Sequence, residues 1–129
     1  MDDRLAEALA PVLEDVARTC ALPASIVDEP WSDLGPSAML MSPDGSGTGI
    51  FVVLAEDEAS QVVRVAEQVQ DWAVEELWAR GLPAVWPHCD LHPDTHPLQA
   101  TQNGLGQPAW ACPVEGWVQG RIGRLEPSG

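Results

Sequence analysis

The sequence predicts an α+β fold, in which an N-terminal helix, short antiparallel strands and one long amphipathic helix precede a C-terminal β-meander. Three observations support this prediction. Residues 3–19 and 57–80 carry apolar side chains at helical spacing. Between them lie short apolar stretches separated by Gly and Pro. From residue 82 onward, Pro, Trp, His and Cys replace most of the charged residues, and the prolines oppose a long helix.

The first helix is expected from Asp3 to Thr19. Its apolar stripe consists of Leu5, Leu9, Val12, Leu13 and Val16. Pro11 lies inside this segment and has no backbone N–H to donate. We therefore expect either a kink at Pro11 or a new helix that begins near Ala10.

Three short strands are expected next, at residues 25–28, 38–42 and 48–55. The segment 43–47 reads Pro-Asp-Gly-Ser-Gly, which favours a glycine-rich loop between the last two strands. The chain contains no lysine, which excludes a Walker-type phosphate loop and any Schiff-base mechanism. The loop is therefore interpreted as part of a plain β-hairpin.

The long helix is expected to begin after a cap at Asp57 or Ser60 and to run to Arg80. Its core face consists of Val62, Val65, Ala66, Val69, Trp72, Ala73 and Leu77. Gly81 and Pro83 follow directly, which is typical of a helix end.

The charge is strongly acidic and unevenly distributed. The formal net charge is −14, and residues 1–80 hold 16 acids against 4 arginines, a net charge of −12. Such a surface repels phosphate backbones, so direct binding of nucleic acid is not expected. It suits either a protein partner with a basic surface or simply an acidic, well-solvated exterior.

A cytoplasmic location is expected. The N-terminus lacks the basic segment and apolar run of a secretory signal. The longest strongly apolar run, residues 50–55, is far too short to span a bilayer, so no membrane association is expected. Thiols stay reduced in the cytosol, and paired cysteines there are more often metal ligands than disulfides.

The most informative pattern is Cys-x2-His-x3-His-x15-Cys, formed by Cys89, His92, His96 and Cys112. Two thiolates and two imidazoles are the donor set that Zn²⁺ takes in closed tetrahedral sites. A single turn across His92–His96 would place both imidazoles on one side. The sequence therefore predicts a Zn²⁺ site with these four ligands.

A hairpin explains how the fourth ligand returns to the other three. Asn103-Gly104 is a strong signal for a two-residue type I′ loop. Such a loop places Gln102 opposite Leu105 and brings Cys112 back to the histidines. A further turn then sends residues 117–122 back along the same sheet.

Four other His, Cys and Trp residues are not predicted to bind the metal. His88 directly precedes Cys89, and adjacent residues rarely face one ion, so His88 is expected to be a non-ligand or a donor to a ligand. Cys20 is expected to be a small core residue. Trp86 and Trp110 are expected to shield the sulfurs from water.

Four ligands favour a structural role, because a catalytic zinc keeps one position for water. Zinc proteases carry His-Glu-x-x-His on a helix, whereas Pro93 follows His92 here. The sequence thus favours a small acidic zinc-binding module that binds another protein, as an adaptor, inhibitor or immunity protein does. The alternative is a small zinc-dependent hydrolase with one open metal position and Asp90 or Asp94 as the general base.

The whole chain, residues 1–129, is expected to form a single domain. Within it, residues 1–81 would form an acidic α/β body, and residues 82–129 a metal-binding β lobe. The sequence leaves open the oligomeric state, the identity of the partner and the pathway. It also leaves open whether His88 replaces one of the four ligands.

Overall fold

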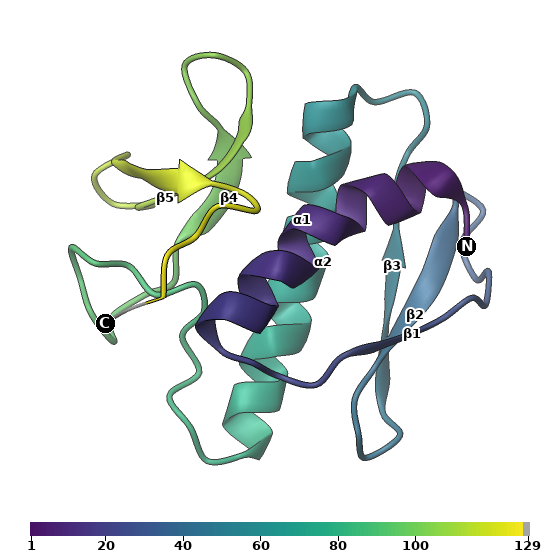
Figure 1. Ribbon diagram of the computed structural model, residues 1–129, viewed down its shortest axis with the longest axis horizontal. Helices are drawn as coiled ribbons and strands as arrows, with labels where there is room; N and C mark the ends of the chain where they lie inside the picture. Colours follow the sequence, from purple (N-terminus) through teal and green to yellow (C-terminus); the bar gives the residue numbers. More distant parts are fainter. Residues whose placement is uncertain (128–129) are drawn as a thin grey trace.

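The computed structural model describes residues 1–127 and contains two helices and two small sheets (Figure 1). The helices are α1 (Asp3–Thr19) and α2 (Glu58–Ala79). The first sheet contains β1 (Ser25–Val27), β2 (Ser37–Met41) and β3 (Gly47–Phe51). The second contains β4 (Gln99–Gln102), β5 (Pro108–Ala111) and β6 (Val118–Arg121). The predicted α+β class and the C-terminal meander are confirmed.

Helix α1 begins at a side-chain cap and continues through its proline. Asp2 Oδ1 accepts hydrogen bonds from the backbone N–H groups of Arg4 and Leu5, at 2.8 and 3.4 Å. Pro11 lies inside a single helix of 17 residues, so no new helix begins at Ala10.

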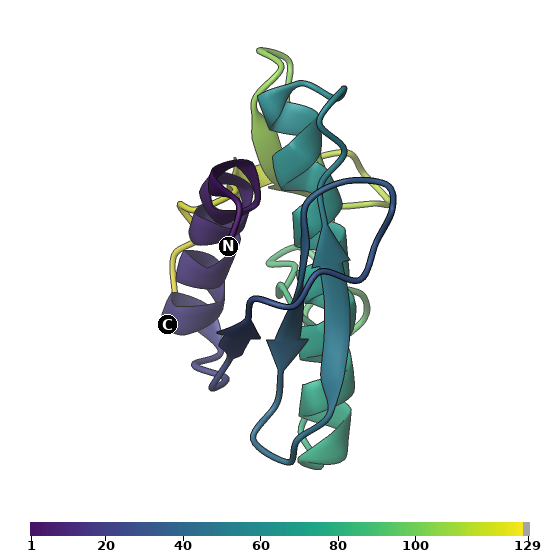
Figure 2. The same ribbon diagram turned by 90° about the vertical axis from the view of Figure 1, so that its right-hand side faces the viewer.

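The first sheet is antiparallel throughout, in the order β1-β2-β3. Strand β3 ends at Phe51, four residues before the predicted end at Ala55. The reason is local, because Glu56 N donates to Val53 O at 3.0 Å and closes a turn there. Helix α2 covers one face of this sheet and leaves the other without a helix (Figure 2).

Helix α2 confirms both predicted boundaries to within one residue. Asp57 caps its start, because its carboxylate accepts from Ser60 N at 2.7 Å. At its end, Leu82 N donates to Leu77 O and Gly81 N to Trp78 O, both at 3.0 Å. Gly81 has φ +68°, the left-handed geometry that ends many helices.

The loop of the β4–β5 hairpin differs from the prediction. Gln102 pairs with Pro108 and not with Leu105, so the register is displaced by three residues. Asn103 Oδ1 accepts from the backbone N–H groups of Leu105 and Gln107, at 2.9 and 3.0 Å. This side chain stabilises a five-residue loop in place of the type I′ turn, and the positive φ falls at Gly106.

A buried carboxylate joins α1 to the second sheet and the C-terminal segment. Asp15 is fully buried and accepts from Trp110 Nε1 and Gly123 N, at 2.9 and 2.7 Å, and from Leu125 N at 3.1 Å. Desolvation raises the pKa of Asp15, and these hydrogen bonds, from Gly123 foremost, offset only part of that effect.

One buried apolar cluster includes residues from both parts of the chain. It contains Leu9 and Val12 of α1, Val65 of α2, and both Cys89 and Cys112.

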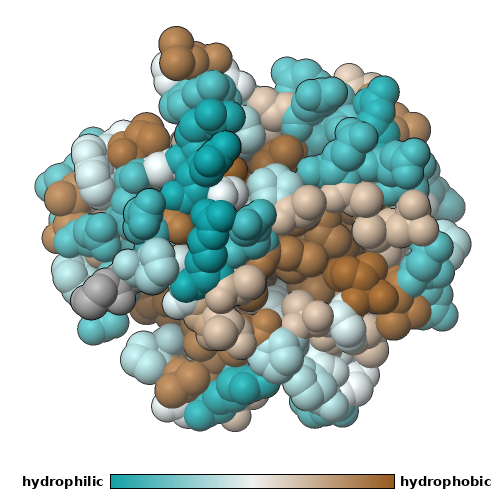
Figure 3. Space-filling view, viewed as in Figure 1, coloured by the Kyte–Doolittle hydropathy of each residue, from teal (hydrophilic) through white to brown (hydrophobic). Residues whose placement is uncertain are grey.

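On the surface, apolar side chains gather right of centre in Figure 3, bordered by polar ones. The division into an acidic body and a metal-binding lobe stays a prediction.

No helix within residues 1–127 combines the length and the apolarity needed to cross a membrane.

Replacing Asp15 with Ala is expected to lower the free energy of unfolding by about 3 to 5 kcal/mol, because two buried N–H groups and one half-buried N–H group lose their acceptor. Urea unfolding followed by tryptophan fluorescence measures the change. Trp110→Phe removes only one of the three donors and is expected to cost about 1 to 2 kcal/mol. An Asp15→Ala protein as stable as the wild type would contradict the role assigned to this carboxylate.

The raised pKa of Asp15 also predicts a pH dependence. Folded Asp15 binds its proton more tightly than the unfolded chain does, so its stabilising contribution is fully present below the ordinary value of 3.8. That contribution is lost as the pH rises through the raised value. The stability of the wild type relative to Asp15→Asn should therefore fall as the pH increases from about 3.5 and then level off. Urea titrations of both proteins at each pH test this, and a difference that grows with pH would refute it.

Candidate metal centre

A closed loop carries three of the four candidate ligands. His88 and Pro97 form an isolated antiparallel bridge, and Leu98 N donates to Pro87 O at 2.9 Å. Residues 88–97 are thus joined at their base while the chain between them forms a compact loop. Cys89, His92 and His96 all lie within it.

Two consecutive turns shape this loop. His92 N donates to Cys89 O, and Thr95 N donates to His92 O, both at 3.2 Å. Asp94 takes a positive φ of 57°, a conformation that Asp adopts more readily than most residues. The turn predicted across His92–His96 is therefore present, and it brings the centroids of the two imidazole rings to 4.8 Å.

The fourth candidate, Cys112, directly follows β5 and begins the turn toward β6. Its N–H donates to Trp117 O, and its carbonyl accepts from Gly116 N, both at 2.8 Å. Gly116 has φ +74°, which favours glycine at this position. The sequence was therefore right that Cys112 returns to the histidines, although the hairpin that returns it has a longer loop than predicted.

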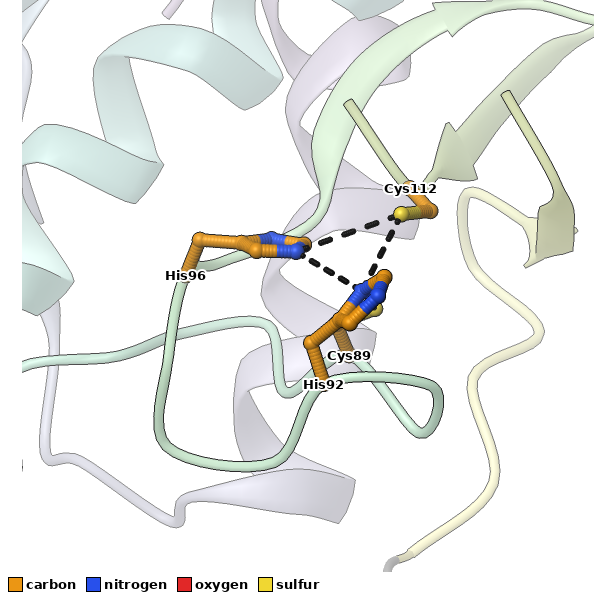
Figure 4. Close-up of side chains that lie close together, drawn as sticks. All are labelled: Cys89, His92, His96 and Cys112. Carbon is orange, nitrogen blue, oxygen red and sulfur yellow. Dashed lines mark hydrogen bonds between the residues drawn. The ribbon is translucent and has the colours of Figure 1, made fainter. Parts of the chain in front are cut away.

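The four side chains converge on one point (Figure 4). His92 Nδ1 lies 3.0 Å from His96 Nε2 and 3.5 Å from Cys112 Sγ. It lies 3.8 Å from Cys89 Sγ, and Cys112 Sγ lies 3.9 Å from His96 Nε2. All four donor atoms fall within 4.8 Å of one another.

These separations suit a tetrahedral zinc. Bond lengths of about 2.3 Å to sulfur and about 2.0 Å to nitrogen require edges of about 3.3 Å between nitrogens and about 3.5 Å between nitrogen and sulfur. The four separations given above lie within about 0.4 Å of those edges. The other two pairs, Cys89 with His96 and Cys89 with Cys112, lie within 4.8 Å, against a sulfur–sulfur edge of about 3.8 Å. A single ion can therefore contact all four donors once Cys89 moves toward the other three.

The ring nitrogens that face away from the cluster lie near oxygen atoms, and only that of His96 is within hydrogen-bond distance. His96 Nδ1 lies 3.0 Å from the carbonyl of Pro97, which can only accept, so Nδ1 carries the proton. His92 Nε2 lies 3.8 Å from Glu115 Oε1. A carbonyl and a carboxylate are the groups that commonly orient metal-binding histidines.

Both candidate sulfurs are fully buried, and all three cysteines are free thiols. The backbone N–H of Glu115 donates to Cys112 Sγ at 3.4 Å. Two thiolates inside an apolar cluster are costly unless a cation neutralises them. The donor set therefore fits a divalent ion, whose charge equals that of the two thiolates.

Two glutamines hold the loop against the rest of the protein. Gln70 Nε2, from α2, donates to the carbonyls of Trp86 and Leu98, at 3.1 and 2.6 Å. Gln119, from β6, accepts from Asp90 N and donates to His88 O, both at 3.0 Å. The base of the loop is thus anchored on a helix and on the same meander that carries Cys112.

The other residues singled out from the sequence lie outside the four-residue cluster. His88 Nδ1 lies 4.0 Å from Asp94 Oδ1, so these two side chains face each other. Asp90 is exposed. Cys20 caps the end of α1 and donates to Val16 O at 3.5 Å, and desolvation raises the pKa of its thiol.

The two tryptophans predicted to shield the sulfurs lie in the buried core beside them, and the shielding itself stays a prediction. Trp86 and Trp110 belong to the same buried cluster as the two sulfurs and contact each other edge-on at 5.4 Å. In addition, Trp86 Nε1 donates to Thr19 Oγ1 at 2.8 Å, and Trp110 Nε1 donates to Asp15. Both indoles therefore tie the region of the metal centre to α1.

Sequence reasoning missed four supporting residues. Asp15 had a usable signal, since an acid three residues after Val12 falls on the apolar stripe of its helix. Glu115 had no signal beyond its place just before the glycine of a turn. Gln70 and Gln119 had no signal, because polar residues on a helix or an edge strand are ordinarily solvated.

Together these features define a candidate Cys2His2 metal centre with two buried cysteines and two half-buried histidines. Compared with protein-family models, curated proteins and solved structures, the chain gives no match. The chemistry of the site itself therefore has to indicate the function.

Cys112→Ser is expected to abolish stoichiometric metal binding, because a neutral hydroxyl replaces a buried thiolate. Elemental analysis of protein purified without added metal should give about one zinc per wild-type chain and close to none for this variant. Cys20→Ser is the matched control and should keep its zinc. Loss of zinc from both variants, or from neither, would contradict the assignment.

Proposed function

We propose that Cys89, His92, His96 and Cys112 hold one Zn²⁺ in a closed structural site. The observation that supports this most strongly is the convergence of two buried sulfurs and two imidazole nitrogens within 4.8 Å. Thiolate and imidazole donors in a tetrahedral arrangement favour zinc over the harder ions Mg²⁺ and Ca²⁺, which prefer oxygen ligands.

The role that we propose for the zinc is to stabilise the fold of residues 88–97 and of the C-terminal meander. Residues 88–97 contain no helix or multi-residue strand, and each strand of the meander has only four residues. Elements this short bury little apolar area of their own. Binding of the ion would join the loop to the end of β5, so that its binding free energy becomes folding free energy for this region.

The protein that results is a small acidic scaffold, and we propose that it serves as a protein-interaction module in a reducing compartment such as the cytoplasm. Its net charge of −14 supports a partner with a basic surface. An adaptor, an inhibitor and an immunity protein all fit this description.

A zinc hydrolase is the alternative, but the surroundings of the cluster favour it less. A hydrolytic zinc needs one coordination position that is open to water, and a general base near that water. Four donors converge here, and the carboxylate of Asp94 lies beside His88 at 4.0 Å. The closed structural site is therefore the function that we propose.

Removing zinc should unfold the region of the centre selectively. We expect a strong chelator to abolish the hydrogen-exchange protection of amides in residues 88–97 and 112–122, because the ion closes that region. Amides in the middle of α2 should keep most of their protection. His88→Gln, which keeps all four donors, should respond to the chelator as the wild type does.

Unchanged protection throughout the chelated protein would contradict a structural role for the metal. An exchangeable metal-bound water in a chelator-resistant fold would instead support the hydrolase.

A further inference from the structure

We propose that the outer face of the first sheet docks a partner protein through a segment that presents apolar side chains flanked by Lys or Arg. This face consists of Val27, Trp31, Met39, Met41 and Phe51 and is called the outer face below. The proposal rests on the proposed function as an interaction module and names the surface and the chemistry of its partner.

Strand register separates the two faces of the sheet. Directly paired residues share a face, and Met39 pairs with Val27 on one side and with Gly49 on the other. The intervening residues Ala38, Leu40 and Ile50 are fully buried. Since α2 covers that buried face, the outer face lacks a helical layer (Figure 2).

Trp31 is held in place on the outer face by several contacts. Its backbone N–H donates to Ser37 Oγ and its indole N–H to Ala38 O, both at 2.9 Å. The indole also packs edge-on against Phe51, with ring centroids 5.6 Å apart. Trp31 remains 48% exposed, so it offers a preorganised aromatic surface of the kind that dominates binding energy at interfaces.

Glycines on β3 make room for these side chains. A Cβ at Gly49 would lie 2.6 Å from the Trp31 ring, and one at Gly47 would lie 2.6 Å from Met41 Sδ. The side chain of Met39 also reaches Gly47. Both methionines are half-buried, and flexible thioethers of this kind adapt to the shape of a binding partner.

The surrounding charge selects the partner. Residues 19–63, which contain the whole sheet, include seven acids and no basic residue. Arg64 stacks on the Phe51 ring at 5.5 Å, but Glu56 engages it at 2.7 and 3.0 Å. The N-terminal ammonium pairs with Asp28 at 2.8 Å, but Asp33 and Asp44 are exposed in the loops that follow Trp31 and Met41 and give this face an acidic border. Such a face complements an apolar segment with basic flanks.

The same charge disfavours a second copy of this chain as the occupant. Two outer faces brought together would oppose their acidic borders, and like charges facing each other at an interface cost binding energy. A heterologous basic segment avoids that repulsion, so it is the occupant to which we commit.

The test uses the zinc-loaded full chain and a synthetic amphipathic peptide of Leu and Lys as the probe. We expect the peptide to shift the amide NMR signals of β1, β2 and β3 specifically. Replacing both methionines, Met39→Ser with Met41→Ser, should weaken its binding about tenfold or more. Leu105→Ser, which alters an exposed apolar residue on the β4–β5 loop, is the control and should bind as the wild type does.

Three outcomes would overturn the proposal. They are no binding, binding that the paired methionine change leaves intact, and equal binding of a Leu and Glu peptide. Self-association of the chain through the outer face would also overturn it, in favour of a second copy. Zinc content measured on the same samples separates the two proposals, because a wild-type chain that carries its zinc and yet does not bind the peptide refutes only the docking surface.

Discussion

Two buried thiols that face two imidazole nitrogens impose the constraint on which the C-terminal part of this protein depends. Cys89 and Cys112 are fully enclosed, so ionising them without a compensating cation would be costly. The donor atoms lie within 4.8 Å of one another, and the outer nitrogen of His96 is committed to a carbonyl. One divalent ion would balance the charge of two thiolates and bind all four donors.

The constraint extends beyond the four donors through a small number of polar contacts. Asp15 on α1 receives hydrogen bonds from β5 and from the C-terminal segment. Gln70 on α2 and Gln119 on β6 donate to and accept from the backbone at the base of the loop formed by residues 88–97. The metal centre is therefore connected to both helices, and a disturbance at the ion should reach α1 through Trp110 and Asp15.

Both helices could be predicted from the sequence, because apolar stripes and helix caps are local signals. Asp57 marks the start of α2, and Gly81 marks its end. The four donors were also visible, since Cys and His at short spacing are rare and chemically distinctive. The β4–β5 loop was not predictable from Asn103-Gly104, because the Asn103 side chain stabilises a longer loop that the dipeptide does not reveal. Asp15 lies on the apolar stripe of α1, which indicates burial but not its partners. Gln70 and Gln119 act through contacts between distant segments, which spacing along the chain does not encode.

Zinc X-ray absorption spectroscopy of the purified protein tests the central claim most directly, because it reports the atoms bonded to the ion. A closed site predicts about two sulfurs near 2.3 Å and about two nitrogens near 2.0 Å, with no oxygen in the coordination shell. A shell with a bound water and fewer than four protein ligands, or one without sulfur, would contradict the account.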